Sequence, residues 1–487
     1  MRAAPAAFAV ILLTVSCTSG GKSGPPLTST SDPVRSSAAS DPPTSTAATN
    51  GPSGPSSPSS PNGPATTSVA DWPTYHGDNQ RTGVAASLTP VHTAARRIWS
   101  LRLDGAVYGS PVVVNGIKIV VTENNSVYSI AGNRVVWRKH LGTPVPRSSL
   151  PCGNVDPLGI TGTPAFDRAT STLVVLAELA NPIRHVAVGL NPSTGAQRWF
   201  RNADVPSSVT GITPTAMQER GALLVSGRRV YIPYGGLAGD CSTYRGSVVG
   251  VDLDHPAGAA LWHFTVPSTR EAGIWTPPGP SENPGGGLLV AVGNGASGPG
   301  DPYDYSDSVL KIAFQQIQDS FSPSSWAADN ANDLDLGSQG PAIVGSRVFA
   351  AGKSGTAYVL NRSALGHIGG EVSHASVCRS FGGTAVLGSV VYVPCTDGVR
   401  AVRINTNGTM TVLWHTTASI TGSPVIGGGR LWALDTGAGV LRTVDRATGA
   451  ALGSLPVGAV SRFATPALYG NAVIVGTLTG VVAYAWS

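Results

Sequence analysis

The sequence predicts an all-β protein, an eight-bladed β-propeller of four-stranded antiparallel blades, on three observations. Of the 487 residues, 61 are glycine and only 12% are charged, which favours turns and strands over surface helices. Eight short segments of related pattern recur at the spacing of propeller blades. Segments rich in Val, Ile and Tyr follow them and end in Gly or Asn turns, as antiparallel strands do.

Each predicted blade opens with a small-small-Pro or Gly-Thr-Ala pattern and continues into a pair of strands. A strand such as RVYIPYGG ends in a glycine turn, and a second strand such as SVVGVDL follows with apolar residues in alternation. This pattern is typical of an antiparallel meander, with one sheet in each unit. The eight openings begin at Gly109, Gly162, Ile212, Trp275, Ser338, Phe381, Gly422 and Ala464.

Several units end in a turn followed by a tryptophan. We expect these rings to pack between adjacent blades rather than to stack on a ligand; they are Trp137, Trp199, Trp262 and Trp414. The last unit, 464–487, has room for only about three strands. The segment ARRIWSLRLDG, Ala95–Gly105, has its own tryptophan and precedes the first opening. We therefore predict that it completes the last blade and leaves no free sheet edge.

The N-terminal residues have the pattern of an export signal. Arg2 precedes an apolar run, Ala6–Val15, that is too short to span a bilayer. The end of the run, LTVSC, resembles the bacterial lipobox, so residues 1–17 are predicted to be a lipoprotein signal peptide with lipid attached to Cys17. An ordinary secretory signal that contains a chance cysteine is the alternative.

Residues 18–70 consist almost entirely of Ser, Thr, Pro, Gly and Ala. This composition offers too little apolar surface to offset the entropy of ordering, and we predict a disordered tether. The propeller is then the remaining domain, 71–487. Anchor and tether together would hold that domain away from a membrane surface.

Four cysteines remain, and disulfides are the default expectation outside the cytoplasm. Three pairings of the four are possible. We favour Cys378 with Cys395 across a short loop and Cys152 with Cys241 across a long one, each worth roughly 3 to 5 kcal/mol in the chain-entropy model.

Other chemistries find little support in the sequence. The net charge of +5 is spread thinly and shows no basic run, so nucleic acid is excluded as an expected partner. The chain has no HExxH, no GxSxG and no glycine-rich phosphate loop between a strand and a helix. Asp301, Asp304 and Asp307 are suited to hold a cation, although a solvated acidic loop is the favoured interpretation.

The unit VGLNPSTGAQRWF resembles the repeat of the pyrroloquinoline-quinone (PQQ) dehydrogenases and of the propeller in the outer-membrane assembly lipoprotein BamB. The entry segment DWPTYHGDNQRTGV is similar to the start of such domains. This PQQ-like resemblance covers nearly the whole predicted propeller. It identifies a fold more firmly than a function.

Quinoprotein alcohol dehydrogenases hold their cofactor in the axial well of such a propeller, and the resemblance extends to several site positions. By resemblance, Trp275 would form the floor under the quinone and Asn294 would help to bind Ca²⁺. Asp333, with Asp335 as the alternative, would act as the base, and Lys353 would contact the quinone oxygens. A carboxylate near a substrate hydroxyl can take its proton, while a cation polarises the hydride acceptor.

The sequence also departs from that family. Cys241 stands where a glutamate ligand of calcium is found, and Asp240 is the nearest carboxylate. The adjacent cysteine pair of many such enzymes is absent, as is a CxxCH haem motif. Each candidate also has a structural alternative: an aspartate turn at 333, a solvated lysine at 353, blade packing at 275 and a turn at 294.

The favoured function is therefore a non-catalytic binding or scaffold module. We expect a membrane-anchored, extracytoplasmic monomer that binds an envelope protein or a small ligand through its propeller loops. The alternative is a PQQ-dependent dehydrogenase that oxidises an alcohol or a sugar, and only this alternative requires PQQ and calcium.

Overall fold

The computed structural model describes residues 70–85, 91, 93–419 and 421–486. All of them lie in the second of two compact units, Thr66–Ser487. The predicted signal peptide, Cys17 and nearly all of the tether lie outside the described residues. No helix in the described part is long and apolar enough to cross a membrane.

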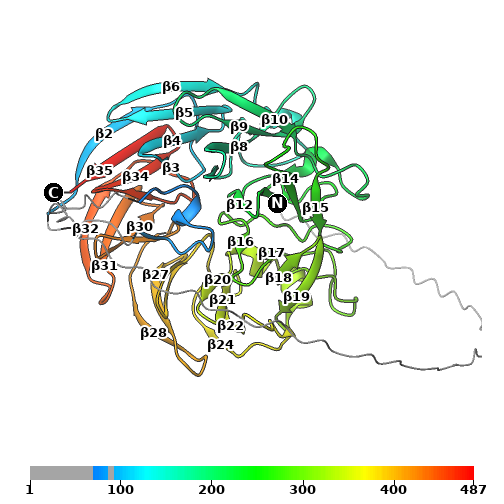
Figure 1. Ribbon diagram of the computed structural model, residues 1–487. Helices are drawn as coiled ribbons and strands as arrows, with labels where there is room; N and C mark the ends of the chain where they lie inside the picture. The colour runs from blue at the N-terminus through cyan, green and yellow to red at the C-terminus, as the bar shows by residue number, and fades with distance from the viewer. Residues whose placement is uncertain (1–69, 86–90, 92, 420, 487) are drawn as a thin grey trace, which may run out of the picture. The chain divides into compact units, whose positions relative to one another are not determined.

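Eight sheets surround a common centre, as Figure 1 shows, and the predicted eight-bladed propeller is confirmed. The blades are numbered in chain order. Blade 1 contains β3 (Val112–Val114), β4 (Ile117–Thr122), β5 (Ser126–Ala131) and β6 (Arg134–His140), and blade 2 contains β7 (Ala165–Asp167), β8 (Thr172–Leu179), β9 (Arg184–Leu190) and β10 (Gln197–Asn202). Blade 3 contains β11 (Met217–Gln218), β12 (Leu224–Ser226), β13 (Arg229–Gly236), β14 (Ser247–Asp252) and β15 (Trp262–Thr265), and blade 4 contains β16 (Ser281–Glu282), β17 (Leu288–Val292), β18 (Ser308–Ala313) and β19 (Gln316–Ser322).

Blade 5 contains β20 (Ala342–Val344), β21 (Arg347–Ala351), β22 (Thr356–Asn361) and β24 (Ser373–Ser376), and blade 6 contains β25 (Ala385–Leu387), β26 (Val390–Cys395), β27 (Gly398–Ile404) and β28 (Met410–His415). Blade 7 contains β29 (Val425–Gly427), β30 (Arg430–Asp435), β31 (Val440–Asp445) and β32 (Ala451–Pro456), and blade 8 contains β33 (Ala467–Tyr469), β34 (Ala472–Thr477), β35 (Gly480–Ala485) and β2 (Arg96–Arg102). Two short strands extend blades in parallel: β1 (Val84–Ala85) on β29 and β23 (His367–Ile368) on β19. The only α-helix in the described part is α1 (Trp326–Ala331), and the 3₁₀ turns are η1 (Tyr75–Gly77), η2 (Arg147–Ser149), η3 (Pro214–Ala216) and η4 (Leu336–Ser338).

The ring closes as the sequence predicts. Strand β2, within the segment Ala95–Gly105, pairs antiparallel with β35 and becomes the outer strand of the eighth blade. The first and last parts of the propeller are thereby hydrogen-bonded to each other, and the eighth blade gains the fourth strand that its own unit lacks.

Tryptophans lie between neighbouring blades, as predicted. The indole nitrogen of Trp137 in blade 1 donates to the carbonyl of Pro192 in blade 2, at 3.1 Å. The turn of blade 2 can receive this ring because Gly195 (φ +70°) has no side chain; a Cβ there would lie 2.6 Å from the indole. Trp414 of blade 6 contacts Gly449 in the turn of blade 7 in the same way. The NPSTG and DRATG turns of the repeat are therefore docking sites for the preceding blade.

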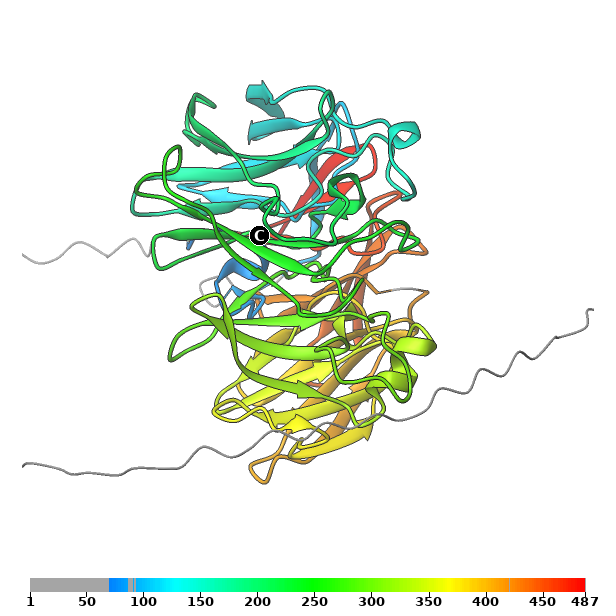
Figure 2. The same ribbon diagram turned by 90° about the vertical axis from the view of Figure 1, so that its right-hand side faces the viewer.

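A plug segment, Asp71–Ala85, lies toward the middle of the ring in both Figure 1 and Figure 2. Its backbone or side chains hydrogen-bond to seven of the eight blades. The partners, from blades 1, 2, 3, 4, 6, 7 and 8, are Val113, Phe166, Val225, Glu282, Val386, Ile426 and Thr465. The entry segment of the repeat thus ties the inner ends of the blades together.

Gly195→Ala tests the docking of one blade on the next. We expect a loss of about 1 to 2 kcal/mol from the positive φ alone, and a further loss of about 1 to 3 kcal/mol because Trp137 must move. Gly132→Ala is the matched control, since Gly132 has φ +57° and nothing within 4 Å of its Cβ position. Chemical denaturation measures both variants, and equal losses would contradict the docking role.

Candidate functional site

A cavity of about 490 Å³ lies where the loops of several blades meet around the axis. It is lined by residues of the β13–β14 loop, of the β17–β18 and β21–β22 connections, and of segments that lead into new blades. The predicted site residues all line it: Asp240, Trp275, Asn294, Asp333, Asp335 and Lys353. The structure therefore brings together every position that the sequence analysis singled out for the cofactor and its metal.

Lys353 forms the electrostatic centre of one side of the cavity. Its ammonium group lies 2.5 Å from Asp333 Oδ1 and 2.6 Å from Asp335 Oδ2. Burial by itself lowers the pKa of Lys353, but the two carboxylates outweigh it and raise the pKa above its usual value. The lysine is thus charged and held in an ion-pair triad with the two aspartates. It is not the solvated lysine that was the alternative interpretation of this position.

The two aspartates differ sharply in environment. The side chain of Asp335 is 2% exposed, whereas that of Asp333 is 68% exposed. The second oxygen of Asp335 accepts a hydrogen bond from the backbone N–H of Asn294, so both of its oxygens are engaged. Asp333 has φ +53°, in keeping with the turn role considered for it, and its Oδ1 faces Lys353. The buried member of the pair is Asp335, the alternative in the sequence analysis.

Trp275 is half-buried, and its ring faces the cavity. The Lys353 ammonium lies 5.9 Å from the ring centroid, and the Phe463 ring packs edge-on at 6.1 Å. The backbone of Asn294 donates to Asp335 and accepts from Ala272, and its side chain forms no hydrogen bond among the described residues.

Two arginines that the sequence analysis did not select line the other side. The guanidinium of Arg462 lies 3.8 Å from the Phe381 ring centroid, and that of Arg220 lies 4.6 Å from that of Phe463. Among the described residues neither guanidinium forms a hydrogen bond or an ion pair. Burial lowers the pKa of Arg220; Tyr108 and Glu123 oppose this shift, and the positive charge of Arg462 adds to it. Two cations therefore lie against aromatic rings in the lining of the cavity, with hydrogen-bond donors that no described residue uses.

The repeat pattern contains a signal for the aromatic residues around these arginines. Tyr108, Trp275, Phe381 and Phe463 stand at the first position of a blade opening or just before it, and all four line the cavity. The opening leads the chain from one blade to the innermost strand of the next. An aromatic residue at this position therefore reaches the axis.

Asp240 does not reproduce the missing glutamate. Its carboxylate accepts a hydrogen bond from the Tyr244 hydroxyl at 2.6 Å, and the residue is exposed. Its neighbour Cys241 is joined to Cys152, which ties the β13–β14 loop to the loop between blades 1 and 2. This disulfide therefore fixes a wall of the cavity.

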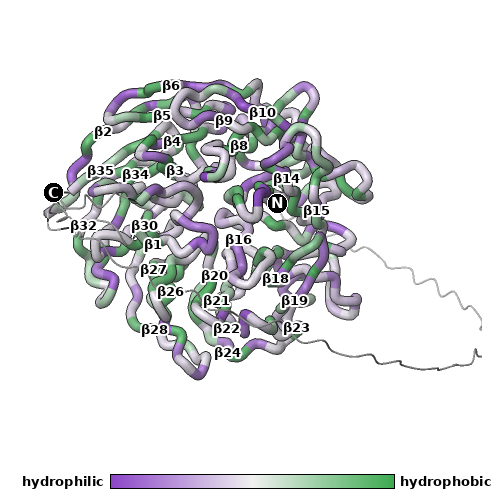
Figure 3. Tube along the Cα trace, in the orientation of Figure 1, coloured by the Kyte–Doolittle hydropathy of each residue, from purple (hydrophilic) through white to green (hydrophobic). Residues whose placement is uncertain are grey.

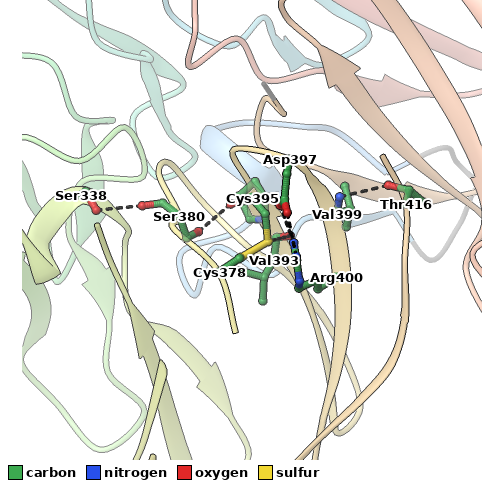
Figure 4. Close-up of a disulfide and its surroundings, with 10 residues drawn as sticks. Ser338, Cys378, Ser380, Val393, Cys395, Asp397, Val399, Arg400 and Thr416 are labelled. Atoms are coloured by element: carbon green, nitrogen blue, oxygen red, sulfur yellow. Dashed lines mark hydrogen bonds and ion pairs between the residues drawn. A yellow bond between two sulfur atoms is a disulfide. The ribbon is translucent and has the colours of Figure 1, made fainter. Parts of the chain in front are cut away.

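The second disulfide joins Cys378 to Cys395 (Figure 4), close in sequence to the cavity-lining Phe381. These are the two pairings that the sequence analysis favoured. In the same segment, Ser380 donates to the carbonyl of Pro394 and accepts from Ser338 of the preceding blade. Arg379 donates to the backbone carbonyl of Lys353 at 3.1 Å. The segment that presents Phe381 is held in place by these contacts.

The residues do not fit a calcium ion. Calcium needs six to eight oxygen ligands, yet both oxygens of Asp335 and one of Asp333 already face Lys353 or the Asn294 amide. No group of three or more His, Cys, Asp or Glu side chains in the described part is placed to hold a metal ion. The loop at 301–307 is no exception. Its Asp301 is exposed, as expected of a solvated acidic loop, but Asp304 and Asp307 are buried, at 8% and 0% exposure.

Three buried glutamates lie in blades 1 to 3, and one of them, Glu123, acts electrostatically on Arg220. Glu123, Glu178 and Glu219 are each at most 5% exposed, and each has one carboxylate oxygen without a hydrogen-bond partner. Glu123 Oε2 accepts from the Gly159 amide and the Thr161 hydroxyl. Burial nevertheless raises the pKa of Glu123 from 4.5 to about 7.

A second, much smaller space shares Tyr108, Arg220, Ser461 and Phe463 with the cavity. Tyr75 of the plug segment also lines it, and it is only large enough for a water molecule.

Comparisons with known proteins agree with this architecture. Residues 91–235 match the family model described as outer membrane protein assembly factor BamB. The repeats there are of the BamB, PQQ-like type. No curated protein matches the chain. The BamB-like match covers less than half of the chain and leaves the cavity's lysine and aspartates outside it.

Similar solved structures show the same fold. Quinohemoprotein alcohol dehydrogenase from Comamonas testosteroni is similar at 17% identity, with a TM-score of 0.64 over 86% of this chain and 81% of that one. BamB from Moraxella catarrhalis is similar at 17% identity, with a TM-score of 0.56 over 81% of this chain and all of that one. The computationally designed Ika8 protein is similar at 11% identity and a TM-score of 0.50. An enzyme, an assembly factor and a designed protein share the fold, so function depends on the site.

Lys353→Met tests the ion-pair triad. Removal of the ammonium leaves Asp335 buried without a counter-charge, which should cost about 3 to 5 kcal/mol of unfolding free energy. Adding Asp335→Asn should recover much of this loss, because the amide oxygen can still accept from Asn294. Lys311→Met on the outer part of β18 is the control and should change stability little.

Glu123→Gln tests the buried carboxyl through pH. Because the folded pKa of Glu123 is raised to about 7, its contribution to stability is full below about pH 4.5 and is lost as the pH rises through 7. The contribution is about 3 kcal/mol. Denaturation of the parent and the variant at several pH values should give a flatter curve for the variant, and parallel curves would contradict the assignment.

Proposed function

We propose that the protein is a non-catalytic binding module of the cell envelope whose axial cavity takes a small organic anion with an aromatic group. The observation that carries the proposal is the pair Arg220 and Arg462, which lie on Phe463 and Phe381 without any carboxylate partner among the described residues. Two arginines held side by side repel each other. A ligand carboxylate would remove that repulsion and accept bidentate hydrogen bonds.

None of the carboxylates that line the cavity forms an ion pair with these arginines, and the buried Glu123, whose charge acts on Arg220, does not line the cavity. Asp333 and Asp335 pair with Lys353, and Asp240 accepts from Tyr244. The cavity thus has Lys353 paired with two carboxylates on one side and, on the other side, two arginines that form no ion pair among the described residues. An aromatic carboxylate matches the second side, because its ring can pack on phenylalanine while its charge meets the guanidinium groups.

The same arrangement disfavours general-base catalysis. A base must have a free oxygen within reach of the proton that it removes. Both oxygens of Asp335 are engaged, and Lys353 holds one oxygen of Asp333. Among the described residues, the one free oxygen of this pair is therefore the second oxygen of Asp333, on a side chain that is exposed to solvent rather than held toward a substrate. Binding without turnover is therefore the better match to these side chains. The predicted lipid anchor at Cys17 and the tether would place a monomeric domain on the extracytoplasmic face of the membrane.

A PQQ-dependent dehydrogenase is the second candidate, and one observation favours it. Trp275, Asn294, Asp333, Asp335 and Lys353 line one cavity, in agreement with the resemblance to quinoproteins. PQQ is itself a planar polycarboxylate and would suit the arginine side. The calcium ligands do not fit, however, and the carboxylates are already paired. For this candidate, the side chains around the quinone would have to bind it without calcium.

Thermal unfolding of the full chain carrying Cys17→Ser separates the two candidates. We expect simple aromatic carboxylates and PQQ to raise the melting temperature by several degrees at concentrations well above Kd, with or without Ca²⁺. Arg220→Gln combined with Arg462→Gln should abolish the rise. Arg347→Gln, on the outer part of blade 5, is the matched control.

A rise with PQQ alone that requires Ca²⁺ and is lost in Asn294→Ala would support the dehydrogenase instead. Dye-linked oxidation of alcohols and sugars then tests turnover directly. No stabilisation by any of these anions would contradict the proposed ligand class.

A further inference from the structure

The outer strands of three consecutive blades share an unusual charge. Strands β2, β6 and β10 are the outermost strands of blades 8, 1 and 2 and lie along one part of the ring's outer edge in Figure 1. Together they carry eight arginines and lysines and no Asp or Glu. We call these residues the basic rim: Arg96, Arg97, Arg102, Arg134, Arg138, Lys139, Arg198 and Arg201.

The outer strands of the other blades carry none. Strands β15, β19, β24, β28 and β32, and the short β23, contain no Arg or Lys, and β19 contains an aspartate. One explanation for charged residues on an outer strand is that they prevent edge-to-edge association between molecules and have no further role. That explanation fails here, because five outer strands in the same ring do without them. The concentration of positive charge on three neighbouring blades therefore indicates a binding surface for a negatively charged partner.

The positive charge of the rim is largely uncompensated. Only Arg138 has a carboxylate partner among the described residues, Asp104 at 2.6 Å. Arg198 and Arg201 donate to backbone carbonyls, which leaves their charge in place. The other five basic residues of the rim have no hydrogen bond or ion pair in the described part of the chain.

Exposed apolar side chains alternate with the basic ones. Ile98, Val135, Val136 and Phe200 are 51%, 41%, 53% and 61% exposed on the same three strands. Figure 3 shows this mixture of hydrophilic and hydrophobic residues along β2, β6 and β10. A soluble polyanion would be recognised by charge alone. A surface that offers cations and apolar side chains together matches the boundary between lipid headgroups and acyl chains.

We propose that the basic rim docks the propeller on an anionic lipid surface. The arginines and lysines would meet headgroup phosphates, and Ile98, Val136 and Phe200 would enter the headgroup region. The proposal is independent of the axial cavity and of any ligand in it. It applies to the folded domain itself, whether or not a lipid is attached at Cys17.

Vesicle co-sedimentation of the full chain carrying Cys17→Ser tests the proposal. Binding should be strong to phosphatidylcholine vesicles that contain about one third phosphatidylglycerol, weak to pure phosphatidylcholine, and should fall as salt rises above about 0.15 M. Arg97→Gln, Arg134→Gln and Lys139→Gln combined should weaken binding at least tenfold. The matched control removes three charges from blades 5 to 7: Arg347→Gln, Arg403→Gln and Arg446→Gln.

A second pair of variants separates lipid from other polyanions. Ile98→Ser with Val136→Ser should weaken vesicle binding several-fold, whereas Val412→Ser with Leu413→Ser on blade 6 should not. Circular dichroism and melting curves confirm that each variant is folded. Equal losses in rim and control variants, binding without phosphatidylglycerol, or tighter binding to inorganic polyphosphate with no effect of the serine variants would overturn the proposal.

Discussion

The pairing of β2 with β35 is the constraint on which the rest of the structure depends. Because this pairing closes the ring, the inner ends of eight blades face one another, and loops that are far apart in sequence meet around one axis. Tryptophans between blades and the plug segment then hold the spacing of those ends. Without closure, Lys353 of blade 5 and Arg462 of the connection to blade 8 would have no common cavity.

Within the cavity, one of the three cationic side chains is paired with carboxylates and the other two are not. Lys353 forms ion pairs with both Asp333 and Asp335, while Arg220 and Arg462 lie on phenylalanine rings and form no ion pair among the described residues. A protein that only needed a stable core would gain from filling this space with apolar side chains. An ordered cationic surface over aromatic rings instead favours the capture of an anion. The two disulfides, which secure loops on either side, support a preformed site.

Much of the fold could be predicted because its signals are local. The eight openings, the glycine turns and the tryptophans each report a contact within a blade or with the next blade, and the three-stranded last unit required a strand from elsewhere. The small additions β1 and β23 could not be predicted, since each is only two residues long and pairs in parallel outside the meander of a blade. The partner of β1 is distant in sequence and is brought near by the closed ring, whereas β23 pairs with the outer strand of the preceding blade.

For the site, resemblance selected positions that do share a cavity, but it could not set their environments. The sequence placed Asp333 ahead of Asp335, whereas burial against Lys353 and the Asn294 amide falls on Asp335. Arg220 and Arg462 were missed because each looks like an ordinary surface arginine until the ring brings it to the axis. The aromatic residues beside the blade openings were the available signal.

A crystal structure with 4-bromobenzoate tests the central claim most directly, because the anomalous signal of bromine locates the ligand without bias. The account predicts a carboxylate between Arg220 and Arg462, with the ring on Phe381 or Phe463 and the Lys353 triad undisturbed. No bromine in the axial cavity at saturating concentration, or a carboxylate bound at Lys353 after displacement of Asp333 and Asp335, would contradict it.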